Sequence, residues 1–127
     1  MYKVAVTGSK WFSDYTKFKS AMNKYIDPTL EAVCILTGYM SGTEELAVRY
    51  AKEEGCSLER FGTDTRAYDG KAVNFRNNAM IAACDMIIVF YDNKSSVSSN
   101  AIKMAYFKDK KIYIEGVDTD ANVSQDS

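Results

Sequence analysis

Short apolar runs alternate with segments of helical periodicity along nearly the whole chain. Runs of strand length lie at residues 4–6, 32–36 and 86–91, with weaker runs at 57–61 and 111–115. Between them, apolar residues recur at the spacing of one helix face, which predicts a helix after the first turn and further helices over about 43–54, 71–83 and 97–109. Five strands joined by four helices indicate a three-layer α/β fold with a mostly parallel sheet.

Helix ends and buried helix faces follow from the same pattern. Ser13 or Asp14 is the expected N-cap of the first helix, and Gly55 is placed to end the second as a left-handed C-cap. The core positions expected in the third helix are Phe75, Ala79, Met80 and Ala83, and those in the fourth are Ala101, Ile102, Ala105 and Tyr106.

Length and charge restrict the class of protein. The 127 residues suit one domain over residues 1–116, followed by a polar tail over 117–127 that we expect to be disordered. The 16 basic and 17 acidic residues nearly balance, whereas duplex-binding domains usually carry a basic surplus, so we expect no nucleic-acid partner. No apolar stretch reaches membrane-spanning length, and the first residues lack a signal-peptide layout. We therefore expect a cytoplasmic protein with no membrane partner.

The absence of histidine restricts the chemistry further. The sequence contains none, which removes the most common general base, the Ser-His and Cys-His nucleophile arrangements and the usual zinc ligands. We expect neither a metal nor a cofactor. Acid–base chemistry, if present, would have to come from carboxylates, Tyr, Lys or water.

Four turns are expected to meet at one edge of the sheet. They cover residues 7–10, 37–42, 70–77 and 92–96, and the first, second and fourth each follow an apolar run. The carboxyl ends of parallel strands share one edge, which is where α/β folds bind their ligands. Glycines, hydroxyls and backbone amides in these turns are suited to phosphate and sugar groups.

These turns carry a resemblance to a known family. The chain resembles the SLOG superfamily of Rossmann-like domains, which includes the Lonely Guy phosphoribohydrolases and the DprA recombination mediators, and it is most similar to the YspA-like branch. The shared features are the segments 6–10, 37–47 and 70–80, together with Asp85 and Asp92 on either side of the strongest strand. The resemblance implies a nucleotide-derived ligand and a homo-oligomer.

The departures from that family bear on activity. Tyr39 and Met40 stand where the family usually has small residues, so bulky side chains overhang the second turn. The phosphoribohydrolases have a glycine-rich fourth turn followed by a catalytic glutamate, whereas residues 93–100 here contain neither glycine nor a carboxylate. The spacing from Arg76 to Met80 is retained. Of the arginine and glutamate that the phosphoribohydrolases combine, the arginine is thus present and the glutamate is absent.

The candidate ligand-binding residues come from all four turns, and no catalytic residue is assigned. Arg76 is the leading candidate, because a guanidinium can hold a phosphate through two parallel hydrogen bonds. Trp11 and Tyr39 are both considered for stacking on a base. The full set is Gly8, Ser9, Lys10, Gly38, Tyr39, Ser41, Gly42, Thr43, Glu44, Asp64, Lys71, Arg76, Asn77, Asp92, Ser95 and Ser96.

Two functions remain open, with a third less favoured. The first is a binding module that captures an ADP-ribose, NAD-related or cyclic-nucleotide ligand without turnover, as a sensor or as a sponge such as a virus would use against nucleotide immune signalling. The second is a phosphoribohydrolase-like N-glycosidase, which would have to recruit Glu44, Asp64 or Asp92. A DprA-like nucleic-acid module is disfavoured by the charge balance.

Overall fold

The computed structural model describes residues 1–63 and 71–119 and contains the expected α/β sandwich. Its strands are β1 (Tyr2–Gly8), β2 (Val33–Thr37), β3 (Ser57–Arg60), β4 (Met86–Tyr91) and β5 (Lys111–Gly116). Its helices are α1 (Tyr15–Tyr25), α2 (Thr43–Glu54), α3 (Lys71–Ala83) and α4 (Ser96–Phe107). Part of the predicted tail, residues 120–127, and the candidate Asp64 lie outside the described residues.

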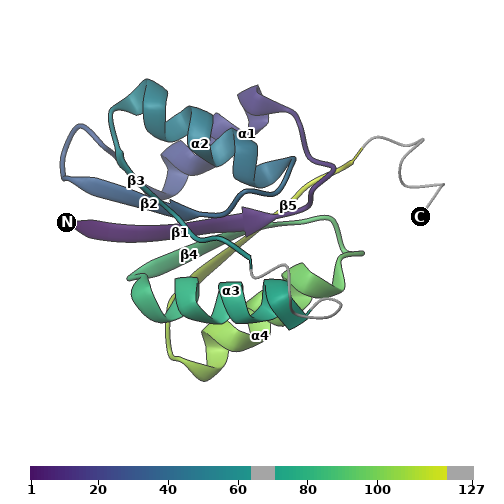
Figure 1. Cartoon of the computed structure of the whole chain (residues 1–127). Coiled ribbons are helices and arrows are strands. Elements are labelled where there is room, and N and C mark those ends of the chain that lie inside the picture. The colour runs from purple at the N-terminus through teal and green to yellow at the C-terminus, as the bar shows by residue number, and fades with distance from the viewer. Residues whose placement is uncertain (64–70, 120–127) are drawn as a thin grey trace.

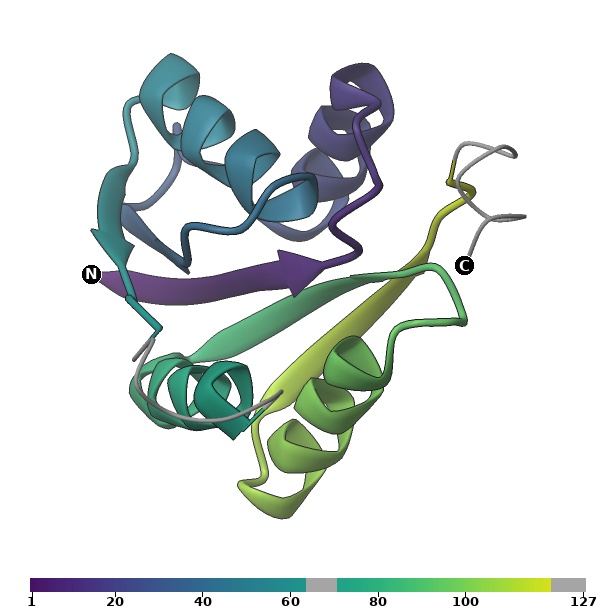
Figure 2. The ribbon, with the colours of Figure 1, turned by 45° about the vertical axis from the view of Figure 1, so that its right-hand side comes forward.

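The sheet is parallel throughout, with the strand order β3-β2-β1-β4-β5. Helices α1 and α2 cover one face and α3 and α4 the other (Figures 1 and 2). From β1 the chain builds outward to β3 and then returns to place β4 on the other side of β1. The strand order therefore reverses between β1 and β4, and a crevice at such a switch point is where open α/β sheets bind ligands.

The core has one apolar cluster on each face of the sheet. Alternate residues of β1 point to opposite faces, so Val4 and Val6 join the α1–α2 cluster while Ala5 joins the α3–α4 cluster. Phe90 of β4 stacks on Phe18 with ring centroids 4.7 Å apart, which anchors α1 to the sheet. Strands buried on both faces explain the continuous apolar runs in the sequence.

The helix caps agree with the sequence prediction. Asp14 is the N-cap of α1, where its carboxylate accepts a hydrogen bond from the Lys17 backbone N–H at 3.1 Å. Gly55 ends α2 in the left-handed conformation, with φ of 71°. No helix within residues 1–63 and 71–119 is long and apolar enough to cross a membrane.

The predicted buried faces of α3 and α4 are partly wrong. Phe75 is 72% exposed, and Ala79, Ala83 and Tyr106 are exposed as well. Met80 is buried as predicted, and the inward face of α3 also carries Ala72, Arg76, Asn77 and Ile81. The error arises because two polar residues occupy buried positions of α3, so its apolar pattern does not mark the inner face.

Candidate functional site

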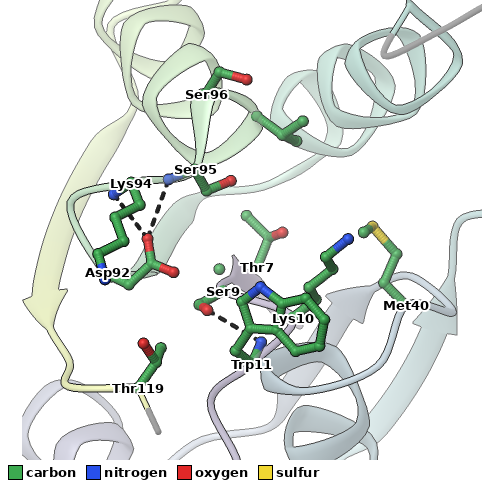
Figure 3. Close-up of a pocket in the computed structure, with 12 residues that line it drawn as sticks. Thr7, Ser9, Lys10, Trp11, Met40, Asp92, Lys94, Ser95, Ser96 and Thr119 are labelled. Carbon is green, nitrogen blue, oxygen red and sulfur yellow. Dashed lines mark hydrogen bonds between the residues drawn. The ribbon is translucent and has the colours of Figure 1, made fainter. Parts of the chain in front are cut away.

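A crevice opens at the carboxyl edge of the sheet, between the ends of β1 and β4 (Figure 3). It has a volume of about 320 Å³. Its walls come from the turn after β1, the turn after β4, the first turn of α4 and Met40 of the turn after β2. The lining residues are Thr7, Gly8, Ser9, Lys10, Trp11, Met40, Asp92, Lys94, Ser95, Ser96, Val97 and Thr119.

The turn after β1 is held on both sides by Ser9. The Ser9 backbone N–H donates to the Phe90 carbonyl of β4 at 2.9 Å, and its carbonyl accepts hydrogen bonds from the N–H and the hydroxyl of Thr43 in α2, at 3.1 and 2.8 Å. The Ser9 hydroxyl oxygen accepts a hydrogen bond from the backbone N–H of Trp11 at 3.1 Å. The first wall of the crevice is thereby fixed to β4 and to α2.

The turn after β4 is organised by Asp92. One carboxylate oxygen accepts the backbone N–H groups of Lys94 at 2.9 Å and Ser95 at 3.1 Å, as Figure 3 shows. Burial favours the neutral acid, but the hydrogen bonds from the Lys94 N–H, the Ser9 side chain and the Ser95 N–H outweigh it and hold the pKa of Asp92 below its usual value. The Ser95 hydroxyl oxygen accepts the Ser98 N–H and caps α4. A carboxylate that is ionised at neutral pH thus lines the crevice.

Behind the crevice lies a buried ion pair between Glu44 of α2 and Arg76 of α3. The two guanidinium NH₂ groups reach the two carboxylate oxygens at 3.0 and 2.8 Å, and both side chains are 1% exposed. Glu44 also accepts the Thr7 hydroxyl at 2.8 Å and the Met40 backbone N–H at 3.1 Å. Because Thr7 and Met40 line the crevice, the pair supports its wall from inside the protein.

Glycine is required at two places beside this pair. A Cβ at Gly38 would overlap the Arg76 guanidinium and the Glu44 carboxylate. Gly42 has φ of 75°, and a Cβ there would overlap the backbone of Lys10. The second turn therefore approaches Arg76 and the first turn more closely than any other residue would allow.

The structure separates the predicted candidates into three groups. Six of them line the crevice: Gly8, Ser9, Lys10, Asp92, Ser95 and Ser96. Five belong to the support behind it: Gly38, Gly42, Thr43, Glu44 and Arg76. Of the others, Tyr39, Ser41, Asn77 and Lys71 are not among the lining residues, and Asp64 lies outside the described residues.

The third group differs residue by residue. Tyr39 is 62% exposed and holds the Arg60 guanidinium 3.9 Å from its ring centroid. The Ser41 hydroxyl donates to the Lys10 carbonyl at 3.4 Å. Asn77 is fully buried, and neither polar atom of its side chain has a hydrogen-bond partner among the described residues. Lys71 is the first residue of α3.

Arg76 meets one expectation and alters another. Its guanidinium lies against Gly38, on the carboxyl edge that also carries Gly8, as the predicted convergence requires. However, both of its NH₂ groups are engaged by Glu44, and only the Nε of its guanidinium lacks a partner among the described residues. Direct contact between Arg76 and a ligand stays a prediction.

Several lining residues were absent from the predicted set. Thr7 and Lys94 fall within the predicted turns, so their proximity to the crevice had a signal in the sequence. Val97 and Thr119 had none, because their approach depends on how α4 and the end of β5 lie in space. Arg60, which donates two hydrogen bonds to the Gly38 carbonyl at 3.2 and 3.1 Å, was also missed.

Comparison with known proteins gives one family and one solved structure. The model of the family described as "YspA, cpYpsA-related SLOG family" matches residues 2–68, and no curated protein matches the chain. An X-ray structure of DNA processing protein A (DprA) from Streptococcus pneumoniae superposes with a TM-score of 0.72 at 17% identity. The alignment covers 90% of this chain and 50% of that protein, so this chain spans about half its length. At this identity the likeness shows the fold alone.

Proposed function

Because the chain belongs to the YspA, cpYpsA-related SLOG family, we propose that it binds a nucleotide-derived small molecule in the crevice between β1 and β4. The ligand classes are an ADP-ribose or NAD-related molecule or a cyclic nucleotide. One observation carries the proposal: turns from both central strands line a cavity of about 320 Å³ at the point where the strand order reverses.

The chemistry of the lining supports a ligand with both phosphate and sugar groups. Lys10 and Lys94 bring two cations to the crevice, and the amino end of α4 adds a partial positive charge. The ionised carboxylate of Asp92 is suited to accept hydrogen bonds from ribose hydroxyls, and Ser96 adds a hydroxyl nearby. The crevice thus offers cations and an acceptor to the two parts of a nucleotide.

Binding without turnover is favoured by the state of Glu44. Its carboxylate already holds Arg76, Thr7 and the Met40 N–H, and it is buried, so it has little freedom to act as an acid or a base. A protein that captures its ligand unchanged would serve as a sensor or as a sponge, including a viral sponge for an immune signalling nucleotide.

Asp92 supports the alternative of an N-glycosidase. An ionised carboxylate in the crevice could stabilise an oxocarbenium-like centre while water adds to the anomeric carbon and the base leaves with a proton. The hydrogen bonds from the turn that hold Asp92 in place suit a ligand-positioning role equally well. Product analysis separates the two functions.

The proposal includes a homo-oligomer formed through α3 and α4. These helices contain no acidic residue, whereas α2 alone contains Glu44, Glu45, Glu53 and Glu54. Phe75 and Phe107 are nevertheless largely exposed on them. Exposed aromatic side chains are typical of protein interfaces. Besides the buried Arg76, the only charged residues in these two helices are Lys71 and Lys103.

Calorimetry with AMP, ADP-ribose, NAD and cyclic AMP tests the proposed function, with chromatography of the same mixtures to detect released base. We expect binding of at least one ligand and its recovery unchanged. Lys10→Gln should weaken that binding by about 5- to 30-fold, the effect of losing one charged hydrogen bond of about 1–2 kcal/mol. Lys52→Gln, at an exposed position in the last turn of α2 and outside the crevice, is the matched control. Absence of binding by all four ligands would refute the proposal, and released base would establish the enzyme.

A further inference from the structure

We propose that Trp11 is the residue that recognises the base, by stacking its indole against an aromatic ring of the ligand. The inference rests on the proposed function and deepens it, because it divides the crevice into two walls. Trp11 and Met40 form an apolar wall, while Asp92, Lys94 and Ser95 form a polar wall. Figure 3 shows the indole beside Lys10, with Met40 beyond it and Asp92 on the opposite side.

The backbone holds Trp11 in this position. Its backbone N–H donates to the Ser9 hydroxyl oxygen at 3.1 Å, which closes the turn. The next residue, Phe12, is buried and stacks on Phe90 with ring centroids 5.7 Å apart. With Ser9 before it and Phe12 after it held in place, the indole is left 46% exposed at the mouth of the crevice rather than packed in the core. A large aromatic ring kept partly open to solvent in a cavity is available for stacking.

Tyr39 does not offer the same platform. It was the other aromatic residue considered for stacking, but it does not line the crevice, and the Arg60 guanidinium covers its ring at 3.9 Å. Arg60 is in turn held by the Gly38 carbonyl. Of these two aromatic residues, Trp11 is therefore the one that a ligand in the crevice would meet.

The position of Lys10 fixes the orientation of the ligand. Its ammonium lies over one face of the Trp11 ring, 5.0 Å from the ring centroid, so a base stacks on the opposite face of the indole or takes the place of this ammonium. A base stacked on the indole therefore places its attached phosphates within reach of a cation. The ribose then lies between the two walls, facing Asp92. This pose predicts that ligands without an aromatic base lose the contribution of Trp11 but keep that of Asp92 and the lysines.

A single tryptophan makes the test direct. Because Trp11 is the only tryptophan in the chain, its fluorescence reports on this site alone. The probes are the tightest of the four adenine ligands and ribose 5-phosphate, which lacks the base. We expect the adenine ligand to change the tryptophan fluorescence at saturation and ribose 5-phosphate to leave it within a few per cent of its starting value.

Three variants complete the experiment. Trp11→Ala should lower the affinity for the adenine ligand by about 5- to 150-fold, which is the range of stacking contributions. It should lower the affinity for ribose 5-phosphate by less than about twofold. Trp11→Phe should restore most of the lost affinity, since it returns an aromatic face. Leu30→Ala, which removes a side chain that is 82% exposed and lies outside the crevice and outside α3 and α4, should change neither affinity.

The outcomes distinguish this inference from the proposed function. The stacking role is refuted if the adenine ligand binds the wild type and binds Trp11→Ala with the same affinity. It is also refuted if the variant lowers the affinity for both probes equally. In either case the proposed function stands. If none of the four adenine ligands binds, the proposed function fails and the role of Trp11 fails with it. A loss confined to the adenine ligand and rescued by phenylalanine supports the inference.

Discussion

The buried pair of Glu44 and Arg76 should make a large contribution to the stability of the crevice wall. Removing one member should therefore lower the free energy of unfolding strongly. In Arg76→Met the Glu44 carboxylate stays buried without its cation, and in Glu44→Gln the guanidinium stays buried without its anion. Each pair member is 1% exposed, so water cannot replace the lost partner. Breaking a buried pair in this way costs about 3–5 kcal/mol.

That cost is large for a domain of this size. Total stabilities are about 5–15 kcal/mol, and each kcal/mol corresponds to about 3–5 °C in Tm for a chain of intermediate length. Each single variant should therefore lose about 10–20 °C. The double variant, Arg76→Met with Glu44→Gln, carries no buried charge. The single amide oxygen of glutamine keeps an acceptor for one of the two donors, the Thr7 hydroxyl or the Met40 N–H, which bind different carboxylate oxygens of Glu44. It should be more stable than either single variant, since uncharged replacements of buried pairs are often neutral.

Urea unfolding followed by circular dichroism measures all three variants. Lys19→Met serves as the control, because it breaks the partly exposed pair of Lys19 with Glu54 at 3.6 Å and should cost less than about 1 kcal/mol. The reasoning is refuted if the single Arg76 variant loses no more than the control. It is also refuted if the double variant loses the sum of the two singles, because independent sites add and a coupled pair does not.

Three further predictions concern the turns and the outer helices. Gly38→Ala should lower the free energy of unfolding, measured with urea, by about 1–3 kcal/mol, because the added methyl group overlaps Arg76. Gly62→Ala should not lower it, because a Cβ there meets nothing within 4 Å. Equal effects of the two variants would contradict the close approach of Gly38 to Arg76. The pKa of Asp92 is lowered in the folded state, so its contribution to stability is full above its unfolded pKa of about 4 and is lost as pH falls through the folded value. The stability gap between the wild type and Asp92→Asn should accordingly narrow below about pH 4, and a gap independent of pH would argue against an ionised Asp92. Phe75→Ser should convert an oligomer to monomers in light scattering if α3 and α4 form the interface, and an unchanged oligomer would exclude Phe75 from it.

The sheet and its helices were predictable because local signals agree with the fold. Strands buried on both faces leave continuous apolar runs, and Asp14 and Gly55 mark helix ends by their own chemistry. The edge on which the turns gather follows from parallel strands, so nine of the twelve lining residues lie in turns that the sequence predicts. These features depend on residues close together in the chain.

The inner face of α3 and the support of the crevice were not predictable in the same way. Arg76 occupies a core position only because Glu44, 32 residues earlier, neutralises it there. A polar residue in a helix suggests an exposed face, and Phe75 suggested a buried one. The pattern therefore predicted the wrong inner face of α3 at both residues. The choice between Trp11 and Tyr39 likewise depends on Arg60, whose contact with Tyr39 has no local signature.

The central claim is that the ends of β1 and β4 enclose a nucleotide-derived ligand. The most direct test is a crystal structure of the chain grown with whichever adenine ligand calorimetry finds tightest. We predict its density between the turn of Gly8 to Trp11 and the turn of Asp92 to Ser96, with phosphate near Lys10. Full occupancy at any other surface, with this crevice holding only solvent, would contradict the account.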